Sequence, residues 1–392
     1  MVRGQLVACA AALVRRVLFV TNGHGEVAIA ARIAEELVAC VPVACDHLAL
    51  VGAFEHGGRM RDVGPQRQMP SGGLIAMGNL RNILRDLRAG LPAHTLAQLR
   101  FLRGSRGTYA IAVAVGDVFA LIMALRAGAR TAFVGTAKSV RVAKYGALET
   151  AVVKRAALVF VRDEPTAQSL RRSGVAAHAG NVIVDLYAPS EPLGITCEPR
   201  LALFPGSREE AYADAVFSCE IVKRLAAAMP ALCAVMSIAP GLDPARFAIE
   251  LERAGWRTQT DADPQRPFVA YAGDRALVHA WRGNIGSMLP GAAAVLGQAG
   301  TANEGAAAAG VPVVAFARSD RDGDAWYRRR QAALLDGALL IVRGDAEQCA
   351  HQVGDLLADG ARRQRMGAIG RERMGPPGAA RAIADRLAEI LA

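Results

Sequence analysis

The sequence predicts an α/β protein of two doubly wound domains, each with a parallel β-sheet covered by helices on both faces and with a cleft between the domains. Three observations predict this fold class. Apolar runs of strand length alternate with helical segments, the alternation breaks once, and 392 residues are too many for one ordinary core. Because the expected strands are apolar on both faces, they are typical of a sheet buried between helix layers.

The first half holds five apolar runs that we expect to be strands. Helices are expected over 27–40, from the end of the third strand through Leu125, and from Glu164 onward. The expected strands are 17–20, 47–52, 109–117, 131–135 and 158–163.

Residues 186–200 break this rhythm with three prolines and one glycine, which indicates a linker between the domains. The alternation then restarts, with helices expected from Glu209, up to about Gly255 and over 378–392. The expected strands of the second half are 201–206, 232–240, 266–273, 292–300 and 311–316.

The net charge of +10 comes mostly from arginine and is concentrated in residues 56–107. Apolar residues alternate with this charge, a pattern typical of a helix that covers a core or of a segment that lies on an anionic membrane surface. RNA binding would require stacking aromatic residues, and Phe101 is the only one here, so we expect no nucleic acid partner. The arginines are Arg59, Arg61, Arg67, Arg81, Arg85, Arg88, Arg100, Arg103 and Arg106.

The seven cysteines show no C-x-x-C spacing, which argues against a zinc site and predicts free thiols in a reducing compartment. Residues 6–14 form an apolar run like that of a signal peptide, but Arg15, Arg16 and the first strand follow at once. We therefore expect a cytoplasmic protein.

Two loops of the second half suit a ligand that contains phosphate. In "FPGSREE" (204–210), Gly206 lets the backbone approach a ligand, Ser207 can cap the next helix, and Arg208 offers a planar fork that matches phosphate oxygens. An ordinary turn with a helix N-cap explains these residues equally well.

The second loop is "GQAGTANEG" (297–305). Gly300 and Thr301 open a helix whose free N–H groups suit a diphosphate, and Glu304, one turn later, can accept two ribose hydroxyl protons. Gln298 is a candidate for fixing the nucleoside. The T-x-x-E spacing also fits a capping box, but the two loops together predict a pocket for a nucleoside diphosphate.

The first half has a glycine turn of its own in "TNGHGE" (21–26), and "GHGEVA" satisfies the dinucleotide fingerprint G-x-G-x-x-A. Asp46 lies about twenty residues further on, where a ribose-binding acid is expected in that interpretation. In "VAVGD" (113–117), Asp117 follows an expected strand and is expected to cap the next helix.

These motifs resemble the lipid-A-disaccharide synthase family. "FPGSREE" followed by "GTANEGAAAAGVPVVAF" (300–316) is similar to its nucleotide-sugar half, and "MGNLRNILRDL" (77–87), "GNVIVD" (180–185) and the last helix extend the likeness along nearly the whole chain. The match is closer to the synthase-related proteins than to the synthase itself.

The resemblance implies a GT-B fold with two Rossmann-like domains facing a cleft. Residues 1–186 would form the acceptor-side domain, residues 187–375 would bind the nucleotide sugar, and residues 376–392 would form a closing helix that crosses back to the first domain. It also implies a cytoplasmic glycosyltransferase, peripheral on the inner face of the membrane where residues 56–107 touch it.

The implied reaction is an inverting transfer from a UDP-sugar to a lipid-linked or amphipathic acceptor. No D-x-D motif stands at an expected cleft position, since "DAD" (261–263) falls in a polar loop, so we expect no metal ion and no cofactor. Asp117 matches the family's catalytic aspartate and would act as the base. Glu26 stands where the family has an aspartate and, since a carboxylate repels a bare phosphate, would orient the acceptor or the sugar. His24 would assist as an acid, a base or a donor to the diphosphate, although such a histidine is often just exposed.

The same resemblance implies that Ser207, Arg208 and the N–H groups of Gly300 and Thr301 hold the leaving diphosphate. Two other classes stay open. A GT-B epimerase of UDP-sugars would share the second half, and a non-catalytic nucleotide- or lipid-binding relative would fit the departures in the first glycine turn.

Overall fold

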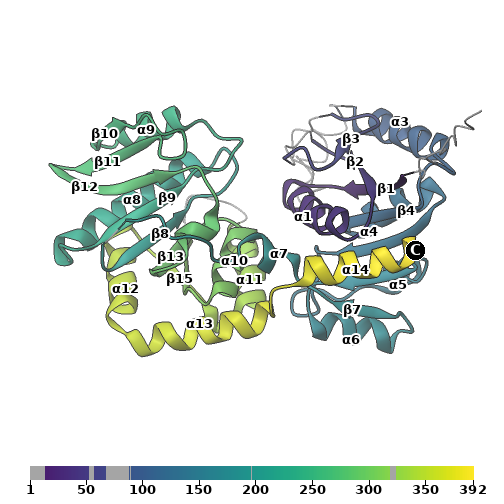
Figure 1. Ribbon diagram of the computed structural model, residues 1–392. Coiled ribbons are helices and arrows are strands. Elements are labelled where there is room, and N and C mark those ends of the chain that lie inside the picture. Colours follow the sequence, from purple (N-terminus) through teal and green to yellow (C-terminus); the bar gives the residue numbers. More distant parts are fainter. Residues whose placement is uncertain (1–13, 53–56, 68–87, 89, 196, 318–323) are drawn as a thin grey trace, which may run out of the picture.

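The computed structural model describes residues 14–52, 57–67, 88, 90–195, 197–317 and 324–392, with backbone alone for residue 24 and for 324–326. The chain forms two α/β units that lie side by side, each built on one sheet (Figure 1). The predicted fold class is confirmed.

Among the described residues, the N-terminal sheet has seven strands in the order β3-β2-β1-β4-β5-β6-β7, and all neighbours are parallel. All five expected strands are present, although β2 begins four residues before the expected start, and the short edge strands β3 and β7 were not predicted. The strands are β1 Arg15–Thr21, β2 Val43–Ala49, β3 Arg61–Asp62, β4 Ile111–Gly116, β5 Arg130–Gly135, β6 Leu158–Val161 and β7 Ala177–Ala179.

The described part of the C-terminal half has an eight-stranded sheet in the order β10-β11-β12-β9-β8-β13-β14-β15. It is parallel from β12 to β15, whereas β11 is antiparallel to both of its neighbours, β10 and β12. The sequence predicts one strand here, at 266–273, but Gly273 and Asp274 form a two-residue turn that joins only antiparallel strands. The strands are β8 Arg200–Phe204, β9 Cys233–Ser237, β10 Arg257–Thr260, β11 Phe268–Ala272, β12 Arg275–Trp281, β13 Ala292–Gly297, β14 Val313–Ala317 and β15 Leu339–Arg343.

Each sheet is buried on both faces because alternate residues of its central strands enter different cores. On β1, Val17 and Phe19 pack on the side of α1, while Leu18 and Val20 pack on the side of α3 and α4. All four side chains are fully buried. The helices are α1 His24–Cys40, α3 Leu91–Gly104, α4 Val118–Ala124, α5 Ala147–Val153, α6 Glu164–Arg172, α7 Val182–Leu186, α8 Ala211–Ala228, α9 Pro244–Arg253, α10 Thr301–Ala309, α11 Asp324–Leu335, α12 Ala346–Ala358, α13 Gly360–Met374 and α14 Ala379–Leu391.

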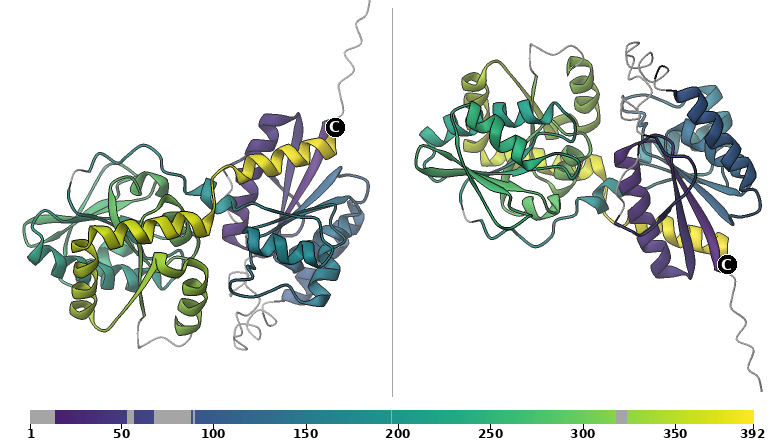
Figure 2. Two further views of the ribbon diagram at one scale, coloured as in Figure 1. Left: turned by 90° about the horizontal axis from the view of Figure 1, so that it is seen from below. Right: turned by 90° about the horizontal axis from the view of Figure 1, so that it is seen from above.

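The last helix packs on the N-terminal unit although the chain reaches it from the C-terminal unit. Figures 1 and 2 show the chain passing from α13 on one unit to α14 on the other. Ile383 and Leu387 of α14 are fully buried in the core that contains Ile33 of α1. Asp185 of α7 caps α14, since its carboxylate accepts a hydrogen bond from the backbone N–H of Ala380 at 2.7 Å.

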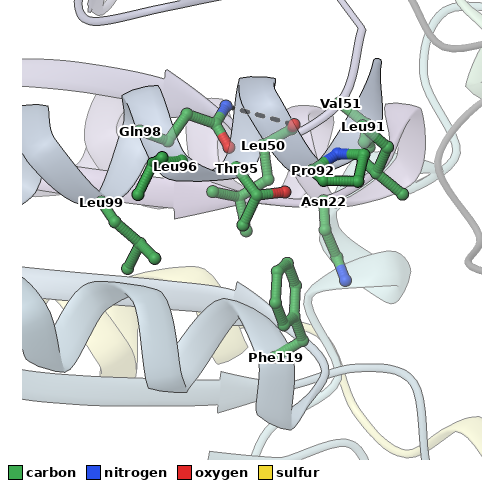
Figure 3. Close-up of a pocket in the computed structure, with 10 residues that line it drawn as sticks. All are labelled: Asn22, Leu50, Val51, Leu91, Pro92, Thr95, Leu96, Gln98, Leu99 and Phe119. Carbon is green, nitrogen blue, oxygen red and sulfur yellow. Dashed lines mark hydrogen bonds between the residues drawn. The ribbon is translucent and has the colours of Figure 1, made fainter. Parts of the chain in front are cut away.

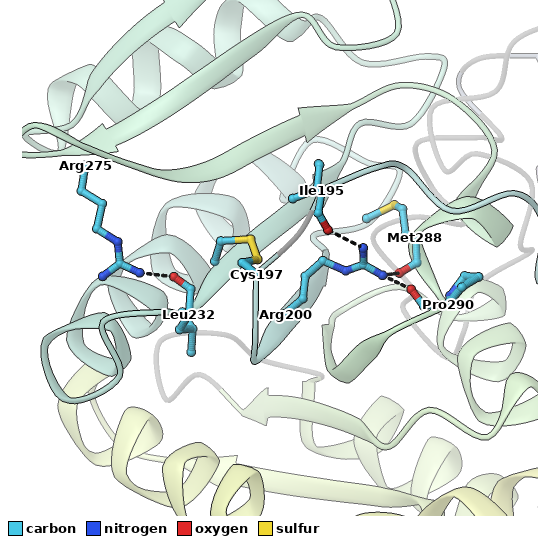
Figure 4. The surroundings of a disulfide bond; sticks show 8 residues. Ile195, Cys197, Arg200, Leu232, Arg275, Met288 and Pro290 are labelled. Atoms are coloured by element: carbon cyan, nitrogen blue, oxygen red, sulfur yellow. Dashed lines mark hydrogen bonds between the residues drawn. A yellow bond between two sulfur atoms is a disulfide. The ribbon is translucent and has the colours of Figure 1, made fainter.

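The linker is tied to the second sheet by a disulfide bond between Cys197 and Cys233, whose Cα atoms lie 5.9 Å apart (Figure 4). Arg200, at the start of β8, is buried beside it and donates to the carbonyl oxygen of Ile195 at 3.3 Å. The prediction of free thiols throughout is therefore wrong for this pair. The spacing of the two cysteines in the sequence did not indicate this bond, because it is the parallel pairing of β8 with β9 that brings Cys197 close to Cys233.

Part of the basic segment 56–107 is visible as packed structure. Arg59 pairs with Glu35 at 2.8 Å, and Arg61 pairs with the buried Asp46 at 3.0 Å. Residues 68–87, which hold about half of its apolar residues, lie outside the described residues, so contact with a membrane surface stays a prediction. No helix in the described part of the chain is long and apolar enough to cross a membrane.

Candidate functional site

In each sheet there is one point at which the strand order changes direction, and the predicted ligand loops follow the two strands on either side of it. In the C-terminal sheet this point lies between β8 and β13, which lead into residues 205–210 and 298–300. In the N-terminal sheet it lies between β1 and β4, which lead into residues 22–23 and Asp117. Open parallel sheets bind ligands outside the carboxyl ends of their strands at such a point. Each half therefore presents its loops at the expected binding edge.

The two binding edges face each other where the units meet. A Cβ placed on Gly25, in the first turn of α1, would lie 3.5 Å from Cγ2 of Thr301, the first residue of α10. The Thr301 hydroxyl is also 3.1 Å from the hydroxyl of Tyr187, in the linker. Figure 1 shows α7 and α10 together at this junction. The first glycine turn and the 300–301 turn thus belong to one site.

Arg208 is exposed and forms no ion pair with any residue that the structure describes. Gly206 has φ of 119°, a conformation that favours glycine, and the turn leaves Ser207 and Arg208 at the surface. The following helix, α8, begins at Ala211 rather than at Glu209, and no side chain caps it. The expectation that Ser207 caps this helix is therefore wrong, because the turn continues past it.

The side chain of Tyr327, on α11, lies beside the 300–301 turn. Its hydroxyl would lie 2.7 Å from a Cβ placed on Gly300. Burial raises the pKa of Tyr327, and the positive charges of Arg328 and Arg208 partly offset this effect. Because β8 and β13 are paired as far as Phe204 and Gly297, the turn that holds Arg208 and the 300–301 turn leave the sheet side by side, within reach of one ligand.

Glu304 does not form the capping box that its spacing allows. Thr301 is the first helical residue rather than the N-cap, and the Glu304 carboxylate is bound instead by the guanidinium of Arg162, which follows β6 in the other unit. Glu304 is buried, which raises its pKa, and the charge of Arg162 offsets part of this rise.

Gln298 follows β13 with its side chain partly buried. Its amide nitrogen donates to the carbonyl oxygen of Phe316 at 2.9 Å. The amide oxygen is buried and has no hydrogen-bond partner among the described residues. This oxygen is therefore a buried acceptor for which none of the described residues supplies a donor.

In the N-terminal unit, Glu26 lies over the glycines of its own turn and of the β4 turn. A Cβ on Gly23 would lie 2.5 Å from Oε2 of Glu26, and one on Gly116 would lie 3.2 Å from its Cγ and 2.4 Å from Oδ1 of Asn22. Burial raises the pKa of Glu26, and the negative charge of Asp117 raises it further.

Asp117 is the N-cap of α4, since its Oδ1 accepts a hydrogen bond from the N–H of Ala120 at 3.0 Å. Its second oxygen, Oδ2, makes no hydrogen bond within the described residues. The cap therefore leaves one oxygen free for a ligand. His24 begins α1 at the same junction, but its side chain lies outside what the structure describes.

Two buried hydroxyls lie at the same edge of the sheet. The hydroxyl of Tyr145 would be 2.5 Å from a Cβ placed on Gly135, at the end of β5, and Thr136 follows that glycine. Neither the Tyr145 nor the Thr136 hydroxyl has a partner among the described residues. Burial raises the pKa of Tyr145, and the negative charges of Glu149 and Asp117 raise it further, while the positive charge of Arg162 lowers it.

An apolar cavity of about 330 Å³ lies in the N-terminal unit between α3 and the start of α4 (Figure 3). Phe119 of α4 faces the side chains of α3 across it, and the Gln98 amide fixes the opposite wall by donating to the Leu50 carbonyl at 3.1 Å. Asn22 belongs both to this lining and to the turn that holds Glu26. The lining residues are Asn22, Leu50, Val51, Leu91, Pro92, Thr95, Leu96, Gln98, Leu99 and Phe119.

The dinucleotide interpretation of the first glycine turn finds no support in the position of Asp46. This residue lies within β2, opposite Leu18 of β1, rather than at the carboxyl end of its strand. Its buried carboxylate is bound by Arg16 and Arg61, so it is not available to a ribose.

Several residues of the junction were not singled out in the sequence. Tyr187 and Tyr327 come from the linker and from α11, and nothing local marks either. Arg162 did carry a signal, because a charged residue directly after a buried parallel strand lies at the binding edge of the sheet. No cluster of three or more histidine, cysteine, aspartate or glutamate residues suited to a metal ion occurs among the described residues.

No protein-family model matches the chain, and no curated protein sequence matches it. Its structure is similar to that of the calicheamicin glycosyltransferase CalG4, at a TM-score of 0.58 and 17% identity over 97% of this chain and 99% of that one. It is also similar to the UDP-GlcNAc 2-epimerase of Methanocaldococcus jannaschii, at a TM-score of 0.52 and 12% identity over 95% of this chain and 99% of that one. A third similar structure is that of MnaA of S. aureus solved with UDP, at a TM-score of 0.58 and 13% identity over 96% of this chain and 97% of that one.

At these identities the likeness concerns the fold. The chain has the GT-B fold, with two Rossmann-like domains, that glycosyltransferases and UDP-GlcNAc 2-epimerases share. A relationship to lipid-A-disaccharide synthases stays a prediction from the sequence motifs.

Proposed function

We propose that the protein is an inverting glycosyltransferase that moves a sugar from a UDP-sugar to an amphipathic acceptor. One observation carries this proposal: an unpaired arginine fork and a helix N-terminus on one sheet edge face a pair of carboxylates on the other. The first pair is Arg208 with the 300–301 turn, which follow paired strands, and the second is Glu26 with Asp117. UDP is named for two of the neighbours of the same fold, the UDP-GlcNAc 2-epimerase of Methanocaldococcus jannaschii and MnaA solved with UDP, which supports UDP as the carrier.

In the proposed reaction, the acceptor hydroxyl attacks the anomeric carbon of the donor sugar from the face opposite the diphosphate. The free Oδ2 of Asp117 takes the hydroxyl proton. A new C–O bond forms while the bond to the diphosphate oxygen breaks, and UDP leaves with the electron pair. Arg208 and the N–H groups at the start of α10 stabilise the charge that develops on UDP, so the proposal needs no metal ion.

Glu26 has a different role in this proposal because burial raises its pKa. It keeps a proton to higher pH than an ordinary glutamate and can donate a hydrogen bond to a sugar or acceptor oxygen. Glu304 and Gln298 hold the ribose and the base of the donor.

The apolar cavity supports an acceptor with a hydrocarbon part. Its volume of about 330 Å³ is roughly twice that of an apolar cavity that binds benzene, so it can hold a medium-length alkyl chain. Because Asn22 joins the cavity to the Glu26 turn, a chain in the cavity places the attached sugar near the carboxylates.

Thermal denaturation with UDP, ADP, GDP and NAD tests the donor class, because a ligand of the native state raises stability by mass action. We expect UDP alone to stabilise the protein clearly. Stabilisation by NAD without UDP would contradict the proposal.

The acceptor is tested with a series of alkyl glucosides and UDP-GlcNAc, following UDP release. Each added methylene that enters the cavity should lower KM by about fourfold, since a buried methylene contributes about 0.8 kcal/mol. Methyl glucoside, which lacks the chain, is the control. A KM that is independent of chain length would exclude the cavity from the acceptor site.

A UDP-sugar epimerase is a second candidate, because the junction brings together three carboxylates, those of Glu26, Asp117 and Glu304. Incubation of UDP-GlcNAc without acceptor separates the two. An epimerase inverts a carbon of the sugar and leaves it attached to UDP, whereas the transferase releases UDP only when an acceptor is present. A non-catalytic relative would bind UDP and do neither.

A further inference from the structure

Two buried polar side chains of α11 hold the peptide group that leads into the 300–301 turn. The Gln331 side-chain amide donates through Nε2 to the backbone carbonyl oxygen of Ala299 at 3.1 Å. Its Oε1 accepts a hydrogen bond at 2.9 Å from Nη1 of Arg328, three residues earlier on the helix. Gln331 is 6% exposed and Arg328 is 5% exposed. These bonds therefore run from a buried positive charge, through an amide, to the backbone of the turn.

The orientation of the Gln331 amide is fixed by its two partners. A guanidinium only donates and a backbone carbonyl only accepts, so the amide satisfies both with its oxygen toward Arg328 and its nitrogen toward Ala299. If the amide turned over, two donors would meet at Arg328 and two acceptors at Ala299. The loss of both hydrogen bonds by a buried amide is costly, which keeps Gln331 a donor to this carbonyl.

This hydrogen bond sets the direction of the Gly300 N–H group. The Ala299 carbonyl and the Gly300 N–H belong to one planar trans peptide, so the two groups point in opposite directions. Because the carbonyl points to α11, the N–H points away from it. α11 contacts β14 and β15, whereas Arg208 follows β8 on the other side of β13. Gly300 is only partly buried, and its N–H makes no hydrogen bond with any residue that the structure describes.

The same peptide can adopt the opposite orientation because residue 300 is a glycine. Gly300 has φ of −80°. Turning the peptide over changes this angle by about half a turn, to roughly +100°, and glycine adopts such values about as readily as negative ones. The Ala299 carbonyl oxygen would then lie where the N–H now lies, and it would repel a diphosphate. A donor at position 331 therefore decides whether the turn attracts or repels phosphate.

We propose, on the basis of the proposed function, that Gln331 is a positioning residue of the donor site, which holds the Gly300 N–H toward the diphosphate, and that Arg328 keeps the Gln331 amide in the orientation this requires. The diphosphate thus receives a backbone interaction in addition to that of Arg208. Because the effect concerns the phosphates alone, a nucleoside without phosphates binds equally well with either orientation of the peptide.

The test replaces Gln331 by the isosteric glutamate. Gln331→Glu keeps the shape of the side chain and the bond to Arg328, but two acceptors then meet at the Ala299 carbonyl, which favours the turned-over peptide. Titration calorimetry gives the Kd of UDP and of uridine for wild type, Gln331→Glu and Arg208→Ala. The matched control is Gln352→Glu, which removes a similar bond from an amide of α12 to a backbone carbonyl at the end of β15, two strands from β13.

The expected result is a UDP Kd that rises at least about tenfold in Gln331→Glu, because a hydrogen bond to a charged group is lost. The uridine Kd should stay at the wild-type value, which also shows that the donor site is folded. Gln352→Glu should match wild type with both ligands. An unchanged UDP Kd in Gln331→Glu, or an equal rise for UDP and uridine, would overturn the inference.

Gln331→Met covers the case in which the glutamate variant does not fold, since methionine is uncharged and keeps an unbranched stem. It leaves the peptide without a fixing donor, so the UDP Kd should rise about two- to tenfold if about half to a tenth of the molecules then hold the native orientation. No rise would likewise overturn the inference. Wild type that binds no UDP, or a UDP Kd that is unaffected by Arg208→Ala, would instead contradict the proposed function on which the inference rests.

Discussion

Replacement of Asp117 separates its two roles, because one oxygen caps α4 and the other is free. Asparagine and aspartate are equally good N-caps, so Asp117→Asn should keep the hydrogen bond to Ala120 and lose only the ability to take a proton. Asp117→Ala removes both functions. The two variants should therefore have similar activity and different stability.

The magnitudes follow from the two functions. Loss of the cap costs about 1 kcal/mol, which lowers the Tm of a domain of this size by about 2–4 °C in Asp117→Ala, while Asp117→Asn stays near wild type. Loss of the base lowers kcat by roughly 10²–10⁴ in both variants. UDP release at saturating donor gives kcat, and thermal denaturation gives Tm.

The reasoning is refuted if Asp117→Asn retains kcat within about threefold of wild type. That result would leave Asp117 as a helix cap alone. A loss of activity in Asp117→Ala only, together with a lower Tm, would lead to the same conclusion.

Three further predictions concern stability. Burial raises the pKa of Glu26, so the folded state loses stability as the pH rises above 4.5, the ordinary pKa of a glutamate. Glu26→Gln should therefore have a higher Tm than wild type at pH 7.5 and the same Tm below pH 4.5. Equal Tm values of variant and wild type at both pH values would contradict this. Reduction of the disulfide, which spans 36 residues, should lower the free energy of unfolding, measured in urea, by about 3–4 kcal/mol. The stability of Cys197→Ser should not change when the reductant is added. An equal loss of stability in wild type and variant would rule out the bond as the cause. Asp185→Ala should lower the free energy of unfolding by about 1 kcal/mol and destabilise α14, which would be measured as faster amide hydrogen exchange over 379–391. Unchanged exchange over these residues would argue against the cap.

The fold was predictable because its signals are local. Apolar runs, helical periodicity and glycine turns predicted the central strands of both sheets, and the loops at both order reversals carried recognisable motifs. The antiparallel hairpin of β11 and β12 was missed because a short polar turn inside one apolar stretch decides it. The disulfide was missed because strand pairing, rather than spacing, brings Cys197 to Cys233.

The candidate site was predictable only in part, for the same reason. Arg208, Asp117 and Glu26 lie in turns that their own sequence defines. Tyr327 and Tyr187 reach the 300–301 turn from other elements, and Glu304 has a partner 142 residues away in Arg162. Such contacts depend on how elements far apart in the sequence pack together, and no local pattern encodes that.

The central claim is that Arg208 and the start of α10 hold the diphosphate of a UDP-sugar. Titration calorimetry of UDP and uridine with wild type and Arg208→Ala tests it most directly. Because a hydrogen bond to a charged group contributes about 1.5–3 kcal/mol, we predict that the variant binds UDP roughly 10- to 150-fold more weakly and binds uridine as wild type does. UDP affinity that is unchanged by the loss of Arg208 would contradict the account.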